Sequence, residues 1–449
     1  MSKPQVFTEA EKKAFRDAID RMRQPGAYEP GKWMVSPLNR DLSITKANFP
    51  SKVTLRDITL RTTEQMPGVV ASEEDRRSFL ERIVDAGVTD VQTSAFPRGH
   101  TMEDMKAEVR VAKSVNPDCE VTYGEVRNTD DIEVAAQAGY DAVQFWAAPW
   151  AEASPIYAGG VYGDTWKGRD WHSLPFPKTR EEQIFRAEAL IAEGRRRHVK
   201  VSAGVNMLPY ATDDYVREYC AAVARAGAYE IVLFDGPSGV GPEAYGHLVR
   251  LAKESAPGVS IGVHAHNMFD LGTACSLNAA REGADVIEVS VNGYCAASGQ
   301  ADLAVVSAAL TILYDVPTGI RHEKLTELAR FGEEFTGRYV AWNHPITGLD
   351  VFNWGGMETV VQELEIDPLL HWCIEPSMFG NIKKWDITRD SGPYTMWDKL
   401  DAIGIEVRKE DVEDILRKCL SEIQQKKRIL TDDEIVEIAQ GVVRSNKES

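Results

Sequence analysis

A regular alternation of short β-like runs with amphipathic helical segments, from Lys52 to Leu313, constrains the fold most strongly. Eight such pairs occupy about 260 residues, the number and spacing of a (β/α)8 TIM barrel. A doubly wound open sheet is the alternative, but eight regular units favour the barrel. The predicted strands are Val53–Leu60, Thr89–Ser94, Glu120–Gly124, Asp141–Trp146, Lys200–Val205, Glu230–Phe234, Val259–His264 and Asp285–Val291.

Segments that do not follow this rhythm flank the barrel. Residues 1–50 are predicted to form an N-terminal extension, and residues 51–316 the catalytic barrel. After Pro317 the alternation stops, so residues 317–449 are predicted to form small α-rich subdomains that act as a lid or a dimer contact. Inside the barrel, an unusually long and aromatic-rich loop covers 150–172. Loops of this length are usually functional lids or interface pieces, and both interpretations stay open.

Composition narrows the class of partners and the compartment. The formal net charge of −18 disfavours nucleic acids and anionic membranes as partners. The six cysteines form no CxxC pair, which is typical of a reduced protein. The first residues lack the apolar core of a secretion signal, and no apolar run reaches 18 residues. We therefore expect a cytoplasmic protein with a small-molecule substrate.

Two histidines end the predicted seventh strand. Barrel enzymes present their site residues from the carboxyl ends of the strands. His264 and His266 are two residues apart, so in an extended segment they point to the same side. The pair can therefore present two imidazoles to one divalent ion. Histidines that only hydrogen-bond the loop are the alternative.

Two arginines are candidates for contact with an anionic substrate. Arg61 ends the predicted first strand, where its guanidinium could hold a carboxylate or polarise a carbonyl. A salt bridge at the rim is the alternative. Arg127 follows the third predicted strand at the same end of the barrel. Asp57 lies four residues before Arg61 and is expected to be a buried structural carboxylate.

The segment after the eighth predicted strand, Val291–Gln300, supplies small residues, one thiol and one neutral amide to the same end. Cys295 could act as a proton donor. A lone cysteine beside small residues is also often inert packing, so both interpretations stay open.

Three motifs, in order and on the expected strands, resemble those of the metal-dependent barrel family that includes 2-isopropylmalate, homocitrate and citramalate synthases, with hydroxymethylglutaryl-CoA lyase and pyruvate carboxyltransferase domains as cousins. The family's D-T-T-L-R-D-G-E-Q-x-P-G-V corresponds to 57–69, and its H-x-H-N-D-x-G to 264–272. Its N-G-I-G-E-R-A-G-N corresponds to 292–300. The likeness covers 52–440 and implies a divalent metal ion, an acyl-CoA co-substrate and a homodimer.

The resemblance assigns roles to retained residues. It implies that His264 and His266 bind the metal and that Arg61 contacts the substrate. Glu64 and Gln65 also match the first motif, and are predicted to take a catalytic and a substrate-binding role.

Other working positions depart from the family pattern. The family's metal-binding Asp corresponds to Thr62. A hydroxyl is a poor metal ligand, so Thr62 is predicted to contact the substrate. The metal-side Asn corresponds to Gln300, which we expect to be a third metal ligand. The histidine that reaches the site from the partner chain corresponds to Glu358, a candidate substitute base. Cys295 is the candidate substitute acid.

The leading hypothesis is an enzyme of aldol or Claisen type acting on a 2-oxo- or 3-hydroxy-carboxylate. Such a reaction enolises a thioester and stabilises an alkoxide, which requires a Lewis acid and a base. The divalent metal could be Mg, Mn, Zn or Co. A lyase that runs the reverse reaction, with Cys295 as proton donor, is the second hypothesis. A non-catalytic binding protein on a reused barrel is the third.

Overall fold

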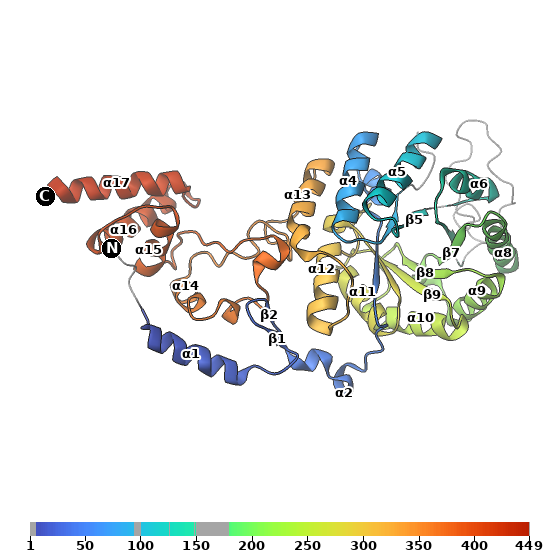
Figure 1. Cartoon of the computed structure of the whole chain (residues 1–449), viewed down its shortest axis with the longest axis horizontal. Coiled ribbons are helices and arrows are strands. Elements are labelled where there is room, and N and C mark those ends of the chain that lie inside the picture. The colour runs from blue at the N-terminus through green and yellow to red at the C-terminus, as the bar shows by residue number, and fades with distance from the viewer. Residues whose placement is uncertain (1–5, 94–99, 125, 148, 150–178, 449) are drawn as a thin grey trace. The chain divides into compact units, whose positions relative to one another are not determined.

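The computed structural model describes residues 6–93, 100–124, 126–147, 149 and 179–448, in two compact units (Figure 1). One unit is Leu38–Val340, and the other combines Met1–Pro37 with Ala341–Ser449. The aromatic loop expected at 150–172 lies outside the described residues.

The larger unit is a closed barrel of eight parallel strands, so the predicted (β/α)8 fold is confirmed. Its strand order is β10-β3-β4-β5-β6-β7-β8-β9. The strands are β3 Thr54–Asp57, β4 Asp90–Gln92, β5 Glu120–Tyr123, β6 Ala142–Ala147, β7 Lys200–Val205, β8 Glu230–Asp235, β9 Ser260–Ala265 and β10 Val286–Val289.

Helices surround the strands, as Figure 1 shows. The helices of this unit are α4 Glu73–Asp85, α5 Met102–Val115, α6 Thr129–Ala138, α8 Arg180–Arg196, α9 Asp213–Ala226, α10 Pro242–Ser255, α11 Gly272–Arg281, α12 Leu303–Ala308 and α13 Leu325–Thr336, together with short α2 Leu42–Thr45 and α3 Thr59–Thr62. Several begin at side-chain caps that the sequence displays. Ser72, for example, forms a capping box with Asp75 at the start of α4.

The first barrel strand is shorter than predicted. It ends at Asp57, because the Asp57 carboxylate accepts hydrogen bonds from the backbone N and the hydroxyl of Thr59, at 2.9 and 2.8 Å. These bonds turn the chain directly into α3. Arg61 therefore lies on a helical turn beyond the strand rather than at the strand's end.

Charged side chains fill part of the barrel interior. The fully buried Arg56 forms ion pairs with Asp90 at 2.9 Å and with Glu230 at 2.8 Å. Its Nη1 atom also lies 3.5 Å from Glu288. Buried charges are tolerated when they are paired in this way. The strand residue Glu288 is thereby held inside the barrel.

The smaller unit has its own apolar core. Its elements are α1 Glu9–Met22, β1 Tyr28–Glu29, β2 Trp33–Met34, α14 Glu358–Leu364, α15 Pro393–Ala402, α16 Lys409–Lys426 and α17 Asp432–Glu448. The core gathers Met396, Ile415, Cys419 and Ala439 from three of these helices. The N-terminal segment joins the unit through a hydrogen bond from the Met34 backbone N to the Cys373 carbonyl, at 2.8 Å.

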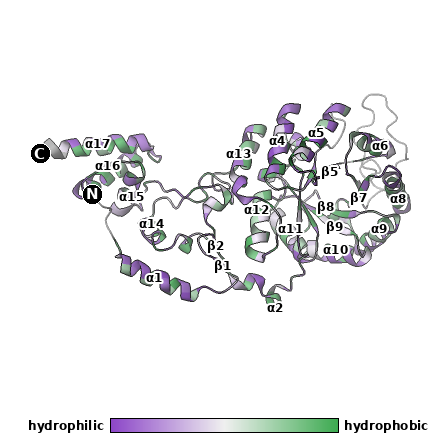
Figure 2. Ribbon diagram, viewed as in Figure 1, coloured by the Kyte–Doolittle hydropathy of each residue, from purple (hydrophilic) through white to green (hydrophobic). Residues whose placement is uncertain are grey.

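Hydrophilic and hydrophobic residues alternate along the helices of both units (Figure 2). Among the helices that the structure describes, none has both the length and the apolar character needed to cross a membrane.

Candidate active site

The two histidines of the HxH motif lie at the carboxyl end of the barrel. His264 is the penultimate residue of β9, and His266 follows the strand. Their ring centroids are 4.9 Å apart. Parallel pairing of His264 with Phe234 of β8 fixes the height of the pair in the barrel. Both imidazoles therefore lie side by side where a barrel enzyme has its site.

His264 is held from behind by a carboxylate. Its Nδ1 atom lies 2.8 Å from Oε2 of Glu288, on the neighbouring strand β10. Burial alone would raise the pKa of Glu288, but the hydrogen bond from His264 and nearby positive charges outweigh it and lower the pKa to about 2. Glu288 is therefore ionised and accepts the Nδ1 proton, which leaves the Nε2 lone pair of His264 available for a ligand.

His266 is kept neutral. Burial, with the charges of His264 and Arg61, lowers the pKa of His266 to about 3. Burial also lowers the pKa of His264, despite the opposing effect of Glu288. A neutral imidazole is the form that binds metal ions. The two rings are thus in the protonation state that a metal site requires near neutral pH.

Arg61 belongs to the same site. Its side chain is 3% exposed, and its guanidinium carbon lies 5.5 Å from the ring centroid of Trp146 on β6. Its positive charge acts on both histidines. The side chain passes closely over Gly124, where an added Cβ would lie 2.8 Å from the Arg61 Cδ atom. A cationic donor is therefore fixed beside the two imidazoles.

Thr62, at the position of the family's metal-binding Asp, has its hydroxyl committed elsewhere. The hydroxyl donates its one proton to the Tyr294 carbonyl oxygen at 2.8 Å, and the Ile58 carbonyl oxygen lies 3.1 Å away. Thr62 is fully buried. It therefore joins the loop after β3 to the loop after β10, and does not take the place of a carboxylate ligand.

Two residues of the loop after β10 come close to His266. The Sγ atom of Cys295 lies 3.8 Å from its Nε2 atom. Gln300 pairs with His266 in an isolated antiparallel β-bridge. Gln300 is 2% exposed, and neither atom of its amide has a hydrogen-bond partner among the described residues. A buried amide normally has partners, so this one is available to a ligand.

These residues fit a divalent ion in part. Two neutral imidazoles and an unpartnered amide are suitable donors. In the described ranges, however, no three His, Cys, Asp or Glu side chains already form a metal-binding group. At the position of the family's metal-binding Asp, Thr62 supplies no carboxylate of the kind that hard ions such as Mg²⁺ prefer.

Other predicted residues hold structural contacts. Glu64 pairs with Arg76 at 3.2 Å and lies 3.7 Å from the His100 ring. Gln65 ends the 3-10 turn Thr63–Gln65. The Arg127 guanidinium is bound by Asp131, with contacts of 3.1 and 3.2 Å.

Glu358 lies in the smaller unit, at the start of α14. Its carboxylate accepts hydrogen bonds from the backbone N atoms of Gly392, Tyr394 and Thr395, at 2.9 to 3.0 Å. The Thr395 hydroxyl donates another, at 2.7 Å. Glu358 thus caps the N-terminus of α15, which lacks a side-chain cap from its own Gly392.

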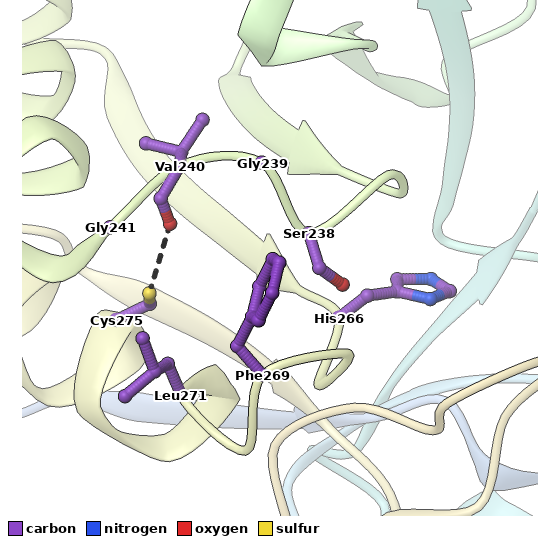
Figure 3. Close-up of a pocket in the computed structure, with 8 residues that line it drawn as sticks. All are labelled: Ser238, Gly239, Val240, Gly241, His266, Phe269, Leu271 and Cys275. Atoms are coloured by element: carbon purple, nitrogen blue, oxygen red, sulfur yellow. Dashed lines mark hydrogen bonds between the residues drawn. The ribbon is translucent and has the colours of Figure 1, made fainter.

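A cavity of about 180 Å³ borders His266. It lies between the loop that precedes α10 and the loop that precedes α11, with His266 at one edge and Cys275 at the opposite edge (Figure 3). The Cys275 thiol points to the Val240 carbonyl oxygen at 3.3 Å. Phe269 and Leu271 add apolar surface to the lining.

Sequence reasoning overlooked Glu288. The residue lies in the apolar run Val286–Val289, which forms a fully buried strand. A charged residue in such a run needs a buried partner, and this signal could have marked it.

Comparisons with known proteins confirm the resemblance that the motifs carry. A family model described as HMGL-like matches residues 172–331. The 2-phosphonomethylmalate synthase of Streptomyces rubellomurinus is 30% identical over 376 residues, which cover 82% of this chain and 92% of that protein. A probable 2-isopropylmalate synthase of Methanopyrus kandleri is 29% identical over 406 residues, covering 89% of this chain and 76% of that protein.

Solved structures share the fold. The hydroxymethylglutaryl-CoA lyase of Bacillus subtilis aligns with a TM-score of 0.53 and 18% identity, over 65% of this chain and 96% of that one. The lyase of Pseudomonas aeruginosa gives the same TM-score and identity, over 65% and 95%. With the likeness spanning nearly the whole length of a relative, the chain belongs to the HMGL-like family of barrel enzymes, whose members similar to it include 2-isopropylmalate, homocitrate and citramalate synthases.

Proposed function

We propose that this enzyme catalyses metal-assisted carbon–carbon bond chemistry of aldol or Claisen type on a 2-oxo- or 3-hydroxy-carboxylate, with an acyl-CoA as co-substrate. The observation that carries the proposal is the group formed by Arg61, His264 and His266. One fixed guanidinium and two neutral imidazoles share the carboxyl end of the barrel. This combination suits a substrate with a carboxylate next to a carbonyl.

Each residue of the group has a distinct role in the proposal. Arg61 binds the substrate carboxylate through its parallel N–H donors and orients the carbonyl. His264 and His266 hold a divalent ion, with the Gln300 amide as an additional oxygen donor. When bound, such an ion supplies Lewis-acid polarisation of the carbonyl. Glu288 keeps the His264 ring in place through its 2.8 Å contact.

A screen of 2-oxo acids with acyl-CoA thioesters tests this function. Wild type, His264→Ala and Arg61→Lys are compared after loading with each of Mg²⁺, Mn²⁺, Zn²⁺ and Co²⁺. We expect the His264 variant to lose at least about 100-fold in kcat/KM. Mutation of a residue that only hydrogen-bonds a metal ligand already lowers metal affinity or activity about 10- to 100-fold. We expect the Arg61 variant to lose chiefly affinity for the carboxylate, because lysine lacks the fork of donors.

His247→Ala is the matched control for the histidine. This residue is exposed on α10 and pairs only with Asp213 in the described contacts, at 2.9 Å. Turnover that survives in His264→Ala as well as in His247→Ala would refute the metal role of the motif.

A carbon–carbon lyase is the second candidate, favoured by the 3.8 Å contact between the Cys295 thiol and His266. In this direction a 3-hydroxy acid is cleaved, and Cys295 protonates the enolate that leaves. Release of a ketone or 2-oxo acid from 3-hydroxy-acyl thioesters, lost in Cys295→Ser, would select the lyase over the synthase.

The proposal includes a cytoplasmic homodimer. The family resemblance supports this, because in the synthases the small subdomain reaches the active site in the barrel of the partner chain. Light scattering of the purified chain would give a mass of two chains, against 49.9 kDa for one. A monomeric mass in an active preparation would contradict this part of the proposal.

A further inference from the structure

We propose that the cavity beside His266 binds a compact apolar group of the substrate, a branched alkyl group or a single ring of about six carbon atoms, and selects the substrate by the size of that group. The inference rests on the proposed function, because it takes the substrate to be held at Arg61 and the two histidines. It goes further by naming the chemical class of the substrate and the residues that select it.

The cavity borders the place where the substrate is held in the proposed function. His266 forms one edge of the cavity, and its ring centroid lies 4.9 Å from that of His264. The positive charge of Arg61 acts on His266. When the substrate carboxylate binds Arg61 and its carbonyl faces the imidazoles, a group on the neighbouring carbon atom therefore points toward the cavity.

The loop after β9 builds an apolar wall of the cavity. In the family motif H-x-H-N-D-x-G the glycine follows the second histidine by four residues, whereas Gly272 follows His266 by six. A hydrogen bond from the Gly272 backbone N to the Asn267 Oδ1 atom, at 2.8 Å, closes the base of this longer loop. The loop places Phe269 and Leu271 on the cavity, 72% and 42% exposed. Neighbouring large apolar side chains that stay accessible beside a site mark a place for an apolar ligand.

Polar groups of the opposite wall are already bound within the protein. The backbone N atoms of Gly239 and Val240 donate to the Asp235 carboxylate, at 3.0 and 2.8 Å. The Ser238 hydroxyl oxygen accepts a hydrogen bond from the Met268 backbone N at 3.2 Å. In these described contacts, the backbone donors that a phosphate or a second carboxylate needs are therefore already used.

The two edges of the cavity are uncharged. At the far edge, the Cys275 thiol donates to the Val240 carbonyl oxygen at 3.3 Å, and burial raises the pKa of this thiol to about 11. At the near edge, burial and the charges of His264 and Arg61 lower the pKa of His266 to about 3. Within the described part of the lining, no side chain is charged near neutral pH. Such a lining favours an apolar group over an anion.

The volume of the cavity sets the size of the group. The cavity measures about 180 Å³. A site for a whole drug-sized ligand measures about 300 to 1,000 Å³, whereas an apolar cavity of about 150 Å³ holds one benzene ring. The cavity therefore accommodates one part of a substrate, such as a phenyl ring or a branched alkyl group. A fused pair of rings exceeds it.

Binding calorimetry on the full-length protein tests the inference without relying on turnover. One series of ligands is pyruvate, 4-methyl-2-oxopentanoate, phenylpyruvate and naphthylpyruvate. A second series is acetyl-CoA, phenylacetyl-CoA and naphthylacetyl-CoA. Comparison of the two series distinguishes whether the 2-oxo acid or the acyl thioester carries the apolar group. The divalent ion and its concentration are kept the same throughout.

Two substitutions alter the cavity in different ways. Gly241 lines the cavity, and an added Cβ there meets nothing within 4 Å, so Gly241→Leu places a side chain in free space. Its φ of −75° and ψ of 168° are allowed for leucine before Pro242. Phe269→Ala removes an exposed part of the wall. The matched controls are Gly441→Leu, where an added Cβ also meets nothing within 4 Å, and Phe185→Ala, which is 66% exposed on α8.

In the series that carries the group, we expect wild type to bind the phenyl compound at least about tenfold more tightly than the methyl compound, and more tightly than the naphthyl compound. Gly241→Leu and Phe269→Ala should each lower this preference at least about fivefold, while the controls keep it within about twofold of wild type. Equal affinities within both series, or a preference unchanged in both cavity variants, overturn the apolar site and leave the proposed function intact. Failure of wild type to bind any member of either series overturns both.

Discussion

The Nδ1 atom of His264 lies 2.8 Å from Oε2 of Glu288, and both side chains are buried in the barrel. The other Glu288 oxygen accepts a hydrogen bond from the Gln144 amide at 2.7 Å. The carboxylate is thus fixed on both sides. It determines which nitrogen of His264 carries the proton and which faces the site.

Replacing Glu288 by glutamine should weaken divalent-ion binding about 10- to 100-fold, because the amide is a poorer acceptor and no longer fixes the ring. Titration calorimetry of the metal-free protein measures the loss. Glu230→Gln is the control, since Glu230 also pairs with Arg56 inside the barrel, at 2.8 Å. Equal losses of ion affinity in the two variants would mean that the total charge inside the barrel, rather than the contact between Glu288 and His264, controls ion binding.

Gly124→Ala should displace Arg61. The new methyl group would lie 2.8 Å from both the Arg61 Cδ atom and the Gln92 Oε1 atom. We expect KM for the carboxylate substrate to rise about tenfold or more, since small misplacements of a positioning group are costly. Steady-state kinetics measure the effect. Gly441→Ala, where a methyl group would meet nothing within 4 Å, should behave like wild type.

Glu358→Gln should destabilise the smaller unit, because an amide replaces a carboxylate that accepts four hydrogen bonds at the start of α15. The expected loss is about 1 to 3 kcal/mol. Chemical unfolding measures the loss, with Glu437→Ala on the exposed face of α17 as the neutral control. Unchanged stability together with lost turnover would instead support a base role for Glu358.

Asp57 should make stability depend on pH. Burial raises the pKa of Asp57 to about 7, although the hydrogen bonds from Thr59 oppose the rise. Between the ordinary carboxyl pKa and about 7, the folded state binds more protons than the unfolded state, so this group's contribution falls as pH rises. Asp57→Asn removes that dependence.

Urea unfolding of wild type and Asp57→Asn at pH 5 and pH 7.5 measures the effect. The free energy of unfolding of Asp57→Asn relative to that of wild type should be higher at pH 7.5 than at pH 5, by about 1 to 3 kcal/mol. A difference that is constant with pH would show that Asp57 is already ionised in the folded state.

The sequence allowed the barrel to be predicted because strand and helix periodicities are local signals. The predicted Lys200–Val205 strand matches β7 residue for residue. The first strand was predicted too long, since a strand-like alternation of apolar and polar residues continues past the point where Asp57 binds Thr59. A side-chain hydrogen bond of this kind leaves no trace in periodicity.

The site was less accessible to prediction, because its decisive contacts are long-range. The spacing of His264 and His266 indicates a shared face without any structure. By contrast, Glu288 meets His264 only because β9 and β10 are neighbours in the closed barrel. Likewise, the contact between Thr62 and Tyr294 joins residues 232 positions apart.

That last contact has a consequence for any attempt to redesign the site. An aspartate introduced at Thr62 would bring a carboxylate oxygen against the Tyr294 carbonyl oxygen, with no proton between two acceptors. A carboxylate can therefore be added at this position only by breaking the link between two loops. The loop that holds Tyr294 would have to be remodelled together with the substitution.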